Sequence, residues 1–576
     1  MDLSAKASKK RQPLPIGVDD YKDLIDEGYV YVDKTLFIKE FWDYKSKVTL
    51  VTRPRRFGKS ITLSMLRYFF EKSEQSRGYL FEKSKIWQED GFKELQGIYP
   101  VISISFKDVK FDTWEASYQK MQSLVADEVR RTLKPLENDI AKDYRITYDA
   151  LINETATQVK VEESLLFITK VFKELFAKNT IILIDEYDSP ITHSYVHGFY
   201  DKMIGFMRNL LSCALKGNVQ LHRGLLTGVV RTAKDGILSG LNNPDIYTML
   251  DAGYSDKFGF TEEEANELLL SFGYLNKKEE LKAWYNGYVV GSKHEVSTKV
   301  YNPWSVLQYI KNACIPETYW ANTGSSELLG RLIGKADEST QKELKLLLEG
   351  NSLINKQINQ DVILLDLDKE NIEPWSFLFF AGYVMADNHV FQDKKHYYTL
   401  SIPNEEIAEL YKKLVQNAIS KKFTSSKLSE LLEALTTGNI NIVNALLEEF
   451  INSMCSFHDL TQDTPERSLH MFVLGLLALL SERYVIKSNL ESGEGRYDIA
   501  MYPKRDDLAI IIEFKKGKDR KLEKLADQAL KQIKANKYDA SLKDFGYRGK
   551  VLCYGVATFK KTLVAKMDTM DTGDQI

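Results

Sequence analysis

The sequence predicts an α/β protein with two separate sheets joined by a mainly helical region. An apolar, β-branched run at residues 48–52 ends in a basic loop and is followed by apolar residues at helical spacing. Three more apolar runs, at residues 101–106, 180–184 and 224–230, follow in the order that a parallel sheet with helical crossovers requires. Near the C-terminus the order of elements becomes α-β-β-β-α-β, which indicates a second α/β domain of another kind.

The composition excludes several classes of protein. The chain has 576 residues, 44% of them hydrophobic, and is long enough for three or four domains of roughly 150 residues. The formal net charge is −3, so any nucleic-acid site must be local. The longest apolar run, residues 471–480, is shorter than the roughly 20 residues that span a bilayer. The polar, basic N-terminus lacks the apolar centre of a secretory signal.

The four cysteines, Cys213, Cys314, Cys455 and Cys553, lie far apart in the chain. They form no C-x-x-C pair, which argues against a structural zinc site and against a disulfide framework. This usage fits a reducing compartment. We therefore expect a cytoplasmic protein without a membrane segment.

The loop after residues 48–52 has the parts of a phosphate-binding site. Gly58, Lys59 and Ser60 stand at a strand-to-helix junction, where backbone N–H groups face an anion. In such a loop Lys59 reaches the β- and γ-phosphates and Ser60 holds Mg²⁺. The match is incomplete, because the motif has glycine in place of Arg53 and because Pro54 has no N–H to donate. The alternative is a basic surface turn before an ordinary amphipathic helix.

A second motif follows the continuous apolar run at residues 180–184, which is typical of a strand buried on both faces. The run ends in Asp185 and Glu186. Asp185 at the carboxyl end of the strand can ligate the Mg²⁺ held by Ser60, and Glu186 can polarise the attacking water. The alternative is a strand that runs into a solvated turn. Together with the phosphate loop, the motif predicts nucleotide binding.

A further strand, expected at residues 224–230, ends in Arg231. In ATPases of the additional-strand class, a strand with a polar sensor lies between the phosphate-loop strand and the strand that ends in Asp-Glu. Thr227 and Arg231 are candidates for sensing the γ-phosphate. The alternative for Arg231 is a surface ion pair.

Five segments resemble the AAA-ATPase-like family of prokaryotic proteins, over roughly residues 14–250. They are Leu14-Pro15-Ile16-Gly17, Asp33-Lys34-Thr35, Arg53-Pro54-Arg55-Arg56-Phe57-Gly58-Lys59-Ser60, Asp185-Glu186-Tyr187-Asp188 and Ser239-Gly240-Leu241-Asn242-Asn243. In that family the arginine-rich loop without the first glycine is the usual form. The resemblance implies ATP and Mg²⁺ as cofactors. The residues expected to bind the nucleotide are Arg56, Phe57, Gly58, Lys59, Ser60, Ile61, Asp185 and Arg231.

Additional-strand ATPases often form rings in which an arginine from the neighbouring copy completes the site. A homo-oligomer is therefore one expected assembly. The candidates for that arginine are Arg53, Arg55, Arg56 and Arg231.

The region from Phe258 onward has a helical pattern, and acidic residues 262–264 suit a helix N-terminus. Aromatic-polar clusters at residues 284–288, 301–305 and 319–322 predict either a helical lid packed with aromatics or a base-stacking surface. Residues from about 345 to 455 are expected to form further helices, with short strands at residues 375–384 and 397–402. They join the first domain to the last.

Three charged residues occupy expected strands near the C-terminus. Glu513 and Lys515 share one face of a strand by its period of two, and Asp498 on the preceding strand can face them. Clustered carboxylates in an apolar sheet are costly unless a cation neutralises them. Mg²⁺ prefers oxygen ligands and activates water, and Lys515 can position that water, so the cluster predicts a nuclease site. The alternative is a structural ion-pair cluster.

These residues resemble the PD-(D/E)XK nuclease superfamily, in the branch found behind AAA-ATPase-like domains. The matching pieces are Ser488-Asn489, Glu491-Ser492-Gly493, Gly495-Arg496-Tyr497-Asp498 and Glu513-Phe514-Lys515. The resemblance implies that Asp498 and Glu513 bind Mg²⁺ or Mn²⁺ and that Lys515 is catalytic. Glu466, on a helix expected at residues 466–480, would complete the metal site. Gln532, followed by Tyr538, matches the motif on the next helix, where it would contact the phosphate.

Residues 515–524 carry six basic and two acidic side chains. Beside a metal site they can hold a nucleic-acid backbone, and we expect DNA as the partner. The alternative is a solvated helix end.

The expected division of the chain is a basic tail (1–12), a P-loop AAA-like ATPase domain (13–255), a helical lid (256–345), a mainly helical connection (346–455) and a PD-(D/E)XK nuclease-like domain (456–576). The expected function is an ATPase coupled to a Mg²⁺-dependent nuclease that acts on DNA, with defence against foreign DNA as an analogy from the domain pairing. The alternative is an ATP-dependent switch or scaffold whose nuclease fold binds nucleic acid without cleaving it.

Overall fold

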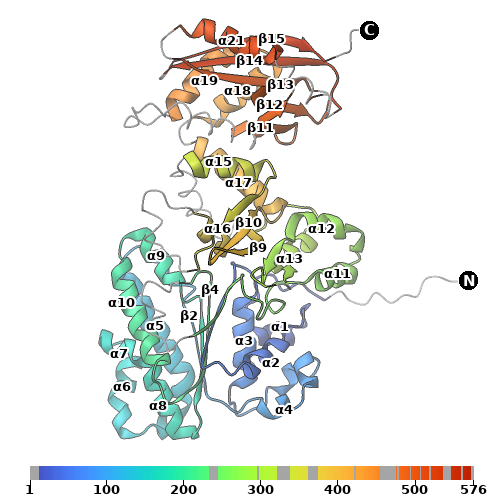
Figure 1. The fold of residues 1–576 in the computed structure, drawn as a ribbon. Helices are drawn as coiled ribbons and strands as arrows, with labels where there is room; N and C mark the ends of the chain where they lie inside the picture. The colour runs from blue at the N-terminus through green and yellow to red at the C-terminus, as the bar shows by residue number, and fades with distance from the viewer. Residues whose placement is uncertain are drawn as a thin grey trace, which may run out of the picture. The chain divides into compact units, whose positions relative to one another are not determined.

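The computed structural model describes residues 12–231, 244–294, 297–320, 338–360, 374–420, 423–454, 475–476, 479–492, 495–505, 507–517, 521–535, 542, 546–559 and 562–572. The chain divides into two compact units. Unit 1 comprises Met1–Trp320 and Ile354–Glu406, and unit 2 comprises Ala321–Leu353 and Ile407–Ile576. Figure 1 shows both units and labels most of their helices and strands.

Unit 1 is built on a five-stranded parallel sheet with the order β2-β3-β4-β1-β5. The strands are β1 (Val48–Thr52), β2 (Val101–Ser105), β3 (Thr180–Asp185), β4 (Leu221–Gly228) and β5 (Asp245–Tyr247). Every residue of β1 and β3 is buried, as expected for strands covered on both faces. β4 lies between β1 and β3, so the additional-strand order predicted from the sequence is confirmed.

Helices cover both faces of this sheet, with α1–α4 on one side and α5–α10 on the other in Figure 1. Residues 112–178 are mostly helical. The helices are α1 (Tyr21–Asp26), α2 (Leu36–Asp43), α3 (Lys59–Phe70), α4 (Phe92–Leu95), α5 (Trp114–Leu133), α6 (Lys142–Ile152), α7 (Gln158–Glu162), α8 (Ser164–Phe176), α9 (Ser189–His197) and α10 (Tyr200–Leu215). Short 3-10 turns lie at Gly78–Leu80, Lys85–Gln88 and Lys134–Asp139.

Three helices and a hairpin follow in unit 1. The helices are α11 (Glu262–Ser271), α12 (Lys278–Tyr285) and α13 (Pro303–Lys311), with a 3-10 turn at Leu275–Lys277, and the hairpin pairs β6 (Tyr288–Val290) with β7 (Thr298–Val300). The helix start predicted at residues 262–264 is confirmed. It is a capping box, in which Thr261 Oγ1 accepts from the Glu264 N–H while the Glu264 carboxylate accepts from the Thr261 N–H.

The aromatic residues of this region are core residues. Tyr285, Tyr288, Tyr301 and Trp320 are at most 1% exposed. Bases cannot stack on rings that are covered by the protein itself. The base-stacking interpretation is therefore wrong for these four residues, and the packed-helix alternative holds.

Unit 1 also contains a small sheet with the order β8-β10-β9, formed by β8 (Leu353–Lys356), β9 (Met385–Gln392) and β10 (Lys395–Ser401). The strand predicted at residues 397–402 is confirmed by β10, but the strand predicted at residues 375–384 is wrong. Residues Trp375–Ala381 form helix α16, which ends at Gly382 with φ 89°. Six of its seven residues are buried, so the run shows no polar face by which a helix could be recognised.

Unit 2 contains the second sheet, with the order β11-β12-β13-β14-β15. β13 and β14 run parallel, and the other neighbours are antiparallel. The strands are β11 (Tyr484–Ser492), β12 (Gly495–Pro503), β13 (Ala509–Lys516), β14 (Lys550–Phe559) and β15 (Thr562–Asp571). The helices are α15 (Glu338–Leu348), α17 (Glu405–Ser420), which begins in unit 1, α18 (Ser425–Thr437), α19 (Ile440–Met454) and α21 (Leu522–Ala535).

The predicted C-terminal strands and α21 are confirmed, and β15 is an additional strand that the sequence analysis did not expect. The two faces of β14 pack against different helices. Gly555 lies under α21, because a Cβ there would be 2.3 Å from the Ala526 carbonyl oxygen. On the other face, the Tyr554 hydroxyl donates to the Leu435 carbonyl in α18 at 2.7 Å.

The helix predicted at residues 466–480 lies mostly outside the described residues, of which 475–476 and 479–480 are helical. Within the described parts of the chain, none of the helices has the length and apolar character needed to cross a membrane.

Candidate functional site

The phosphate loop joins β1 to α3. Its backbone takes left-handed values at Arg56 (φ 67°) and at Gly58 (φ 84°), which precedes the first turn of α3. Lys59 is buried, and its Nζ donates to the Arg53 and Pro54 carbonyls at 3.1 and 2.9 Å. Burial lowers the pKa of Lys59, and the nearby Glu186 and Asp185 carboxylates act in the opposite direction. The loop therefore folds around the lysine expected to bind phosphate.

The Asp185 carboxylate is the meeting point of four elements. Ser60 Oγ of α3 donates to Oδ2 at 2.6 Å, and Thr227 Oγ1 of β4 donates to Oδ1 at 2.6 Å. Ser105 at the end of β2 lies 3.5 Å from Oδ2. Carboxylate and hydroxyl oxygens are the ligands that Mg²⁺ prefers, so this donor set fits that ion. Ser105 was not recognised in the sequence, where it appeared only as part of an alternating strand.

Residues 186–188 connect β3 to α9. Glu186 has φ 49°, a left-handed value that is uncommon for a residue with a side chain and that is often found at functional sites. Asp188 is buried and accepts from the Val229 and Val230 N–H groups at 2.8 and 2.9 Å. Burial raises the pKa of Asp188, which these two bonds partly counter. Asp188 thus ties the end of β3 to the segment after β4, a role that the sequence did not reveal.

Arg53 explains why this loop needs no glycine at its first position. The side chain is fully buried, and it donates to the Thr52, Tyr247, Gly253 and Tyr254 carbonyls at 2.9–3.3 Å. Burial lowers its pKa to about 10. A side chain bound in this way cannot reach a neighbouring copy, so Arg53 is excluded as the arginine that completes another subunit's site.

The outer part of the loop is held by the helical region of unit 1. The Arg55 carbonyl accepts from Asn302 Nδ2 and Trp320 Nε1 at 3.3 and 3.2 Å. The Arg56 guanidinium lies 4.5 Å from the Trp304 ring centroid. Phe57 is buried, and Ile61 lies half-buried in the first turn of α3. Arg56 is exposed, whereas Arg231 lies beyond β4 with its Nη1 3.5 Å from Gln360 Oε1.

A buried carboxylate supports the same region. Glu406 accepts from Ser305 Oγ at 2.8 Å and from the Trp320 N–H at 2.7 Å. Burial raises the pKa of Glu406 to about 7. The indole Nε1 of Trp320 also donates to the Arg55 carbonyl. Trp320 therefore connects the Glu406 carboxylate to the phosphate loop.

The C-terminal charged residues also converge, all within unit 2. Asp498 Oδ2 accepts from the Phe514 N–H at 2.7 Å, and Lys515 Nζ lies 3.6 Å from Glu513 Oε1. Gln532 of α21 connects the pair: its Nε2 donates to Glu513 Oε1 at 2.6 Å and its Oε1 accepts from Lys515. Gln532 therefore holds two site residues, and its contact with the phosphate stays a prediction.

Glu513 is buried in this cluster. Burial and the Asp498 charge raise its pKa to about 7, against the effect of Lys515. Its Oε2 is buried without a hydrogen-bond partner among the described residues. Burial also raises the pKa of Asp498, which Lys515 and Lys345 of α15 counter. A buried carboxylate with an unpartnered oxygen beside a second carboxylate fits a divalent cation.

Comparison with known proteins finds a matching family model for each of the two regions. Residues 15–238 match the family model described as predicted AAA-ATPase, and residues 464–567 match that of the PD-(D/E)XK nuclease superfamily. The chain therefore joins a region similar to predicted AAA-ATPases to a region similar to PD-(D/E)XK nucleases. It is also 26% identical over 400 residues to a protein of Azotobacter chroococcum mcd 1, described as an uncharacterized protein in the vnfD 5' region. That alignment spans 69% of this chain and 68% of the other.

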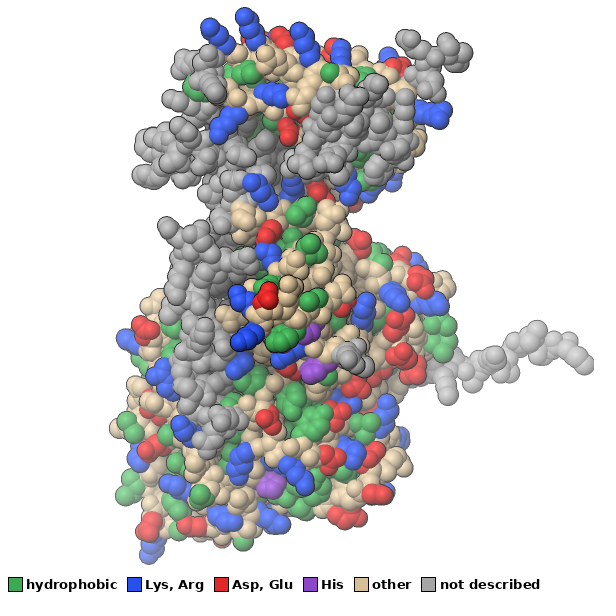
Figure 2. All heavy atoms as spheres, in the orientation of Figure 1, with side chains coloured by type: hydrophobic (Ala, Val, Ile, Leu, Met, Phe, Trp, Pro, Cys, Tyr) green, Lys and Arg blue, Asp and Glu red, His purple; other side chains and the backbone are tan. Residues whose placement is uncertain are grey.

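Some of the other predicted site residues lie outside the described part of the chain. In the nuclease region, Glu466 and Tyr538 lie outside the described residues, as do residues 239–243 of the AAA-ATPase-like resemblance. Of the basic stretch, Lys516, Lys521 and Lys524 are exposed. On the face shown in Figure 2, Lys and Arg side chains line one edge of unit 2 with Asp and Glu side chains among them.

Proposed function

We propose that unit 1 binds and hydrolyses ATP with Mg²⁺ and that unit 2 cleaves DNA with Mg²⁺ or Mn²⁺ under control of the nucleotide. The observation that carries this proposal is the Glu513 carboxylate, buried with one unpartnered oxygen beside Asp498 and Lys515. A purely structural ion-pair cluster would leave no such oxygen, because an unsatisfied buried acceptor lowers stability.

The roles in the ATPase site follow from the contacts. Ser60 and Asp185 would hold Mg²⁺, which when bound supplies positive charge to the β- and γ-phosphates. Lys59 exchanges its two loop carbonyls for phosphate oxygens. Glu186 accepts a proton from the attacking water. Thr227 orients Asp185, and the exposed Arg56 contacts the nucleotide from the outer loop.

The residues of the nuclease site are likewise assigned to metal binding, to water positioning and to binding of the nucleic-acid backbone. Asp498 and Glu513, with Glu466 as the sequence resemblance implies, would hold the divalent ion, which when bound activates water and stabilises charge on the phosphate. Lys515 positions the water. Gln532 keeps Lys515 and Glu513 at a fixed distance. The exposed lysines after β13 bind the DNA backbone.

The proposal also includes the location, the assembly and the biological role of the protein. We place the protein in the cytoplasm of a prokaryote, as a homo-oligomer with Arg55, Arg56 or Arg231 completing a neighbour's site. Defence against foreign DNA rests on the pairing of the two regions alone. We also propose the division into domains at residues 13–255, 256–345, 346–455 and 456–576.

The decisive experiment uses the purified full-length protein with labelled DNA and RNA of one sequence. Each is incubated with Mg²⁺, Mn²⁺ or EDTA, with and without ATP. We expect metal-dependent cleavage of DNA that changes with ATP, and loss of cleavage in Asp498→Asn and Glu513→Gln. Glu449→Gln is a matched control, because Glu449 is an exposed carboxylate on α19 that pairs with the surface Lys427 and lies outside the basic stretch.

The outcomes separate the alternatives. Cleavage that persists in both Asp498→Asn and Glu513→Gln would overturn the nuclease assignment. DNA binding without cleavage by the wild type under every metal would favour an ATP-dependent switch. Phosphate release that is unchanged by Lys59→Ala would overturn the ATPase assignment independently of the nuclease.

A further inference from the structure

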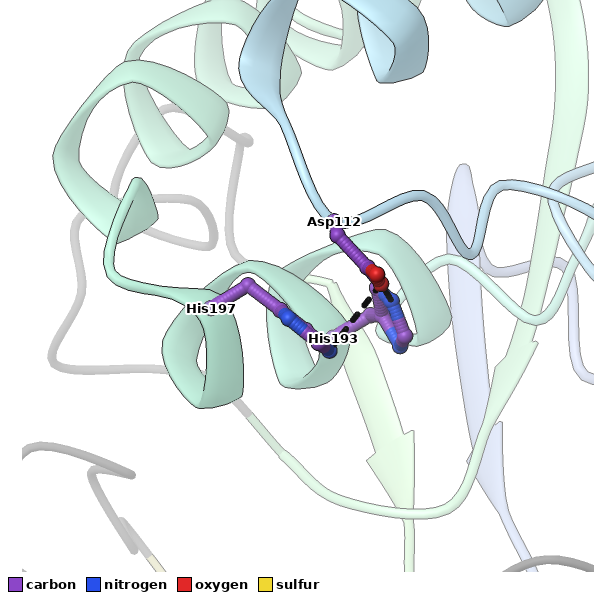
Figure 3. A group of neighbouring side chains, drawn as sticks. All are labelled: Asp112, His193 and His197. Carbon is purple, nitrogen blue, oxygen red and sulfur yellow. Dashed lines mark ion pairs between the residues drawn. The ribbon is translucent and has the colours of Figure 1, made fainter.

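A second kind of metal cluster lies in unit 1, away from the residues assigned to ATP. His193 and His197 are four residues apart on α9, so their side chains share one face of the helix. Asp112 directly precedes Thr113, the N-cap residue of α5. Figure 3 shows the two imidazoles of α9 directed toward the Asp112 carboxylate. The three ligand atoms all lie within 4.8 Å of one another.

The distances suit coordination better than hydrogen bonding. Asp112 Oδ1 is 3.6 Å from His193 Nε2 and 3.4 Å from His197 Nε2. Both exceed the usual range of about 2.7–3.2 Å for an N–H···O hydrogen bond. Ligands about 2.0–2.1 Å from a tetrahedral Zn²⁺ are about 3.4 Å apart, which follows from the bond lengths and the tetrahedral angle. The two distances from Asp112 are therefore close to the ligand spacing of such a site, and all three ligand atoms lie within 4.8 Å of one another.

The burial of one imidazole nitrogen and the exposure of the carboxylate both suit a metal site. His193 Nε2 is buried without a hydrogen-bond partner among the described residues, and Asp112 Oδ1 is its ion-pair neighbour. The Asp112 side chain is 78% exposed, so an ion and its remaining water ligands can enter from solvent.

We propose that Asp112, His193 and His197 form a binding site for one divalent transition-metal ion of the Zn²⁺ class. Two imidazoles and one carboxylate are ligands of that class, whereas Mg²⁺ and Ca²⁺ prefer oxygen alone. The ion joins the end of α9 to the segment that enters α5. Because α9 starts at Ser189, directly after Asp188, the site lies on the helix that continues from the carboxylates of the ATPase region.

The test titrates Co²⁺ and then Zn²⁺ into the full-length protein carrying Asp498→Asn and Glu513→Gln, which removes the nuclease carboxylates. We expect a visible absorption band of tetrahedral Co²⁺ that Zn²⁺ displaces, and a Zn²⁺-dependent rise in Tm. Asp112→Asn and His197→Gln should each weaken Zn²⁺ binding at least about tenfold, because even the loss of a group behind a ligand weakens metal binding by that much. Asp112 is exposed, so Asp112→Asn keeps the test valid if the histidine variant does not fold.

The chain provides a matched control. His389 and His396 form another histidine pair, with Nε2 and Nδ1 2.7 Å apart on β9 and β10. His396→Gln should leave the Co²⁺ band and the Zn²⁺ affinity unchanged. The proposal is overturned if His396→Gln abolishes the band, if Asp112→Asn and His197→Gln leave it intact, or if no band forms.

Discussion

Ser60 Oγ donates a hydrogen bond to Asp185 Oδ2 at 2.6 Å, although the two residues are 125 positions apart in the chain. The contact joins the start of α3 to the end of β3. Thr227 lies on β4, between β1 and β3, and its Oγ1 donates to Oδ1 of the same carboxylate at 2.6 Å. The two sequence motifs that predicted nucleotide binding therefore meet at one carboxylate.

Asp185→Asn is expected to lower ATP turnover by about 100-fold or more, because it removes the charge that would hold Mg²⁺ beside Ser60. Thr227→Val keeps the charge and loses only one hydrogen bond, so a smaller loss is expected, with a higher Mg²⁺ requirement. Phosphate release measured across a Mg²⁺ titration distinguishes the two effects. Asp149→Asn, at a half-exposed surface carboxylate, should behave as wild type. Equal activity of Asp185→Asn and wild type would refute the assignment.

Gly555→Ala is expected to damage the nuclease region alone. A Cβ at residue 555 would lie 2.3 Å from the Ala526 carbonyl oxygen and 2.9 Å from the Leu530 N, both backbone atoms of α21. The helix must move away, and Gln532 moves with it. We expect unit 2 to lose about 1–3 kcal/mol and DNA cleavage to fall, while ATP turnover is retained.

Gly205→Ala is the control for that substitution, since a Cβ on this residue of α10 has no heavy atom within 4 Å. It should be neutral or slightly stabilising. Thermal unfolding followed together with both activities checks the pair. A Gly555→Ala protein with normal Tm and normal cleavage would show that α21 is not fixed against β14 as described.

Local patterns carried the prediction of both sheets. The strand β1, the phosphate loop and α3 are contiguous, so one stretch of sequence contained their whole signal. The predicted position of β4 between β1 and β3 also held, because it follows from the class of sheet. By contrast, β15 carries polar and partly exposed residues in its second half, so its sequence has no clear strand pattern. It forms a strand because it pairs with β14 along its length.

It was harder to predict from the sequence which side chains come together at the two sites. Ser105 and Lys345 lie near site carboxylates only because separate elements pack together, and no spacing in the sequence reveals this. Asp188 belongs to the motif at residues 185–188, but its bond to the Val229 N–H comes from packing in the same way. The sequence showed Arg53 only as a mismatch to the general motif that is usual in the resembling family, and as one candidate for a neighbour's site. Its partners are carbonyls about 200 residues downstream. Asp498, Glu513 and Lys515 were found because they interrupt apolar strands.

Arg53→Met is expected to destabilise unit 1 by about 3 kcal/mol. The substitution leaves buried carbonyls of Tyr247, Gly253 and Tyr254 without their donor, and each unsatisfied buried acceptor is unfavourable. Arg53→Lys should also destabilise, since an ammonium cannot span the same acceptors. Denaturant unfolding measures both. Arg130→Met, at an exposed ion pair, should change stability by less than about 1 kcal/mol, and an equal effect of Arg53→Met would contradict the buried role.

Glu406 should make the stability of unit 1 fall as the pH rises. Burial raises the pKa of Glu406 to about 7 in the folded protein, from 4.5, and the neutral donors Ser305 Oγ and the Trp320 N–H only partly offset this. Below pH 4.5 the carboxyl is protonated in both the folded and unfolded states. Between about pH 4.5 and 7 the unfolded state loses the proton first, so folding becomes less favourable across this window.

Glu406→Gln removes that titration while keeping an acceptor for Trp320 and a partner for Ser305. We expect the variant to match wild type near pH 4.5 and to exceed its stability by roughly 3 kcal/mol above pH 7. Tm measured from pH 4.5 to 8 for both proteins provides the difference, in which the other titrating groups cancel. A difference that stays constant with pH would show that the pKa of Glu406 is not raised in the folded protein, and would refute this prediction.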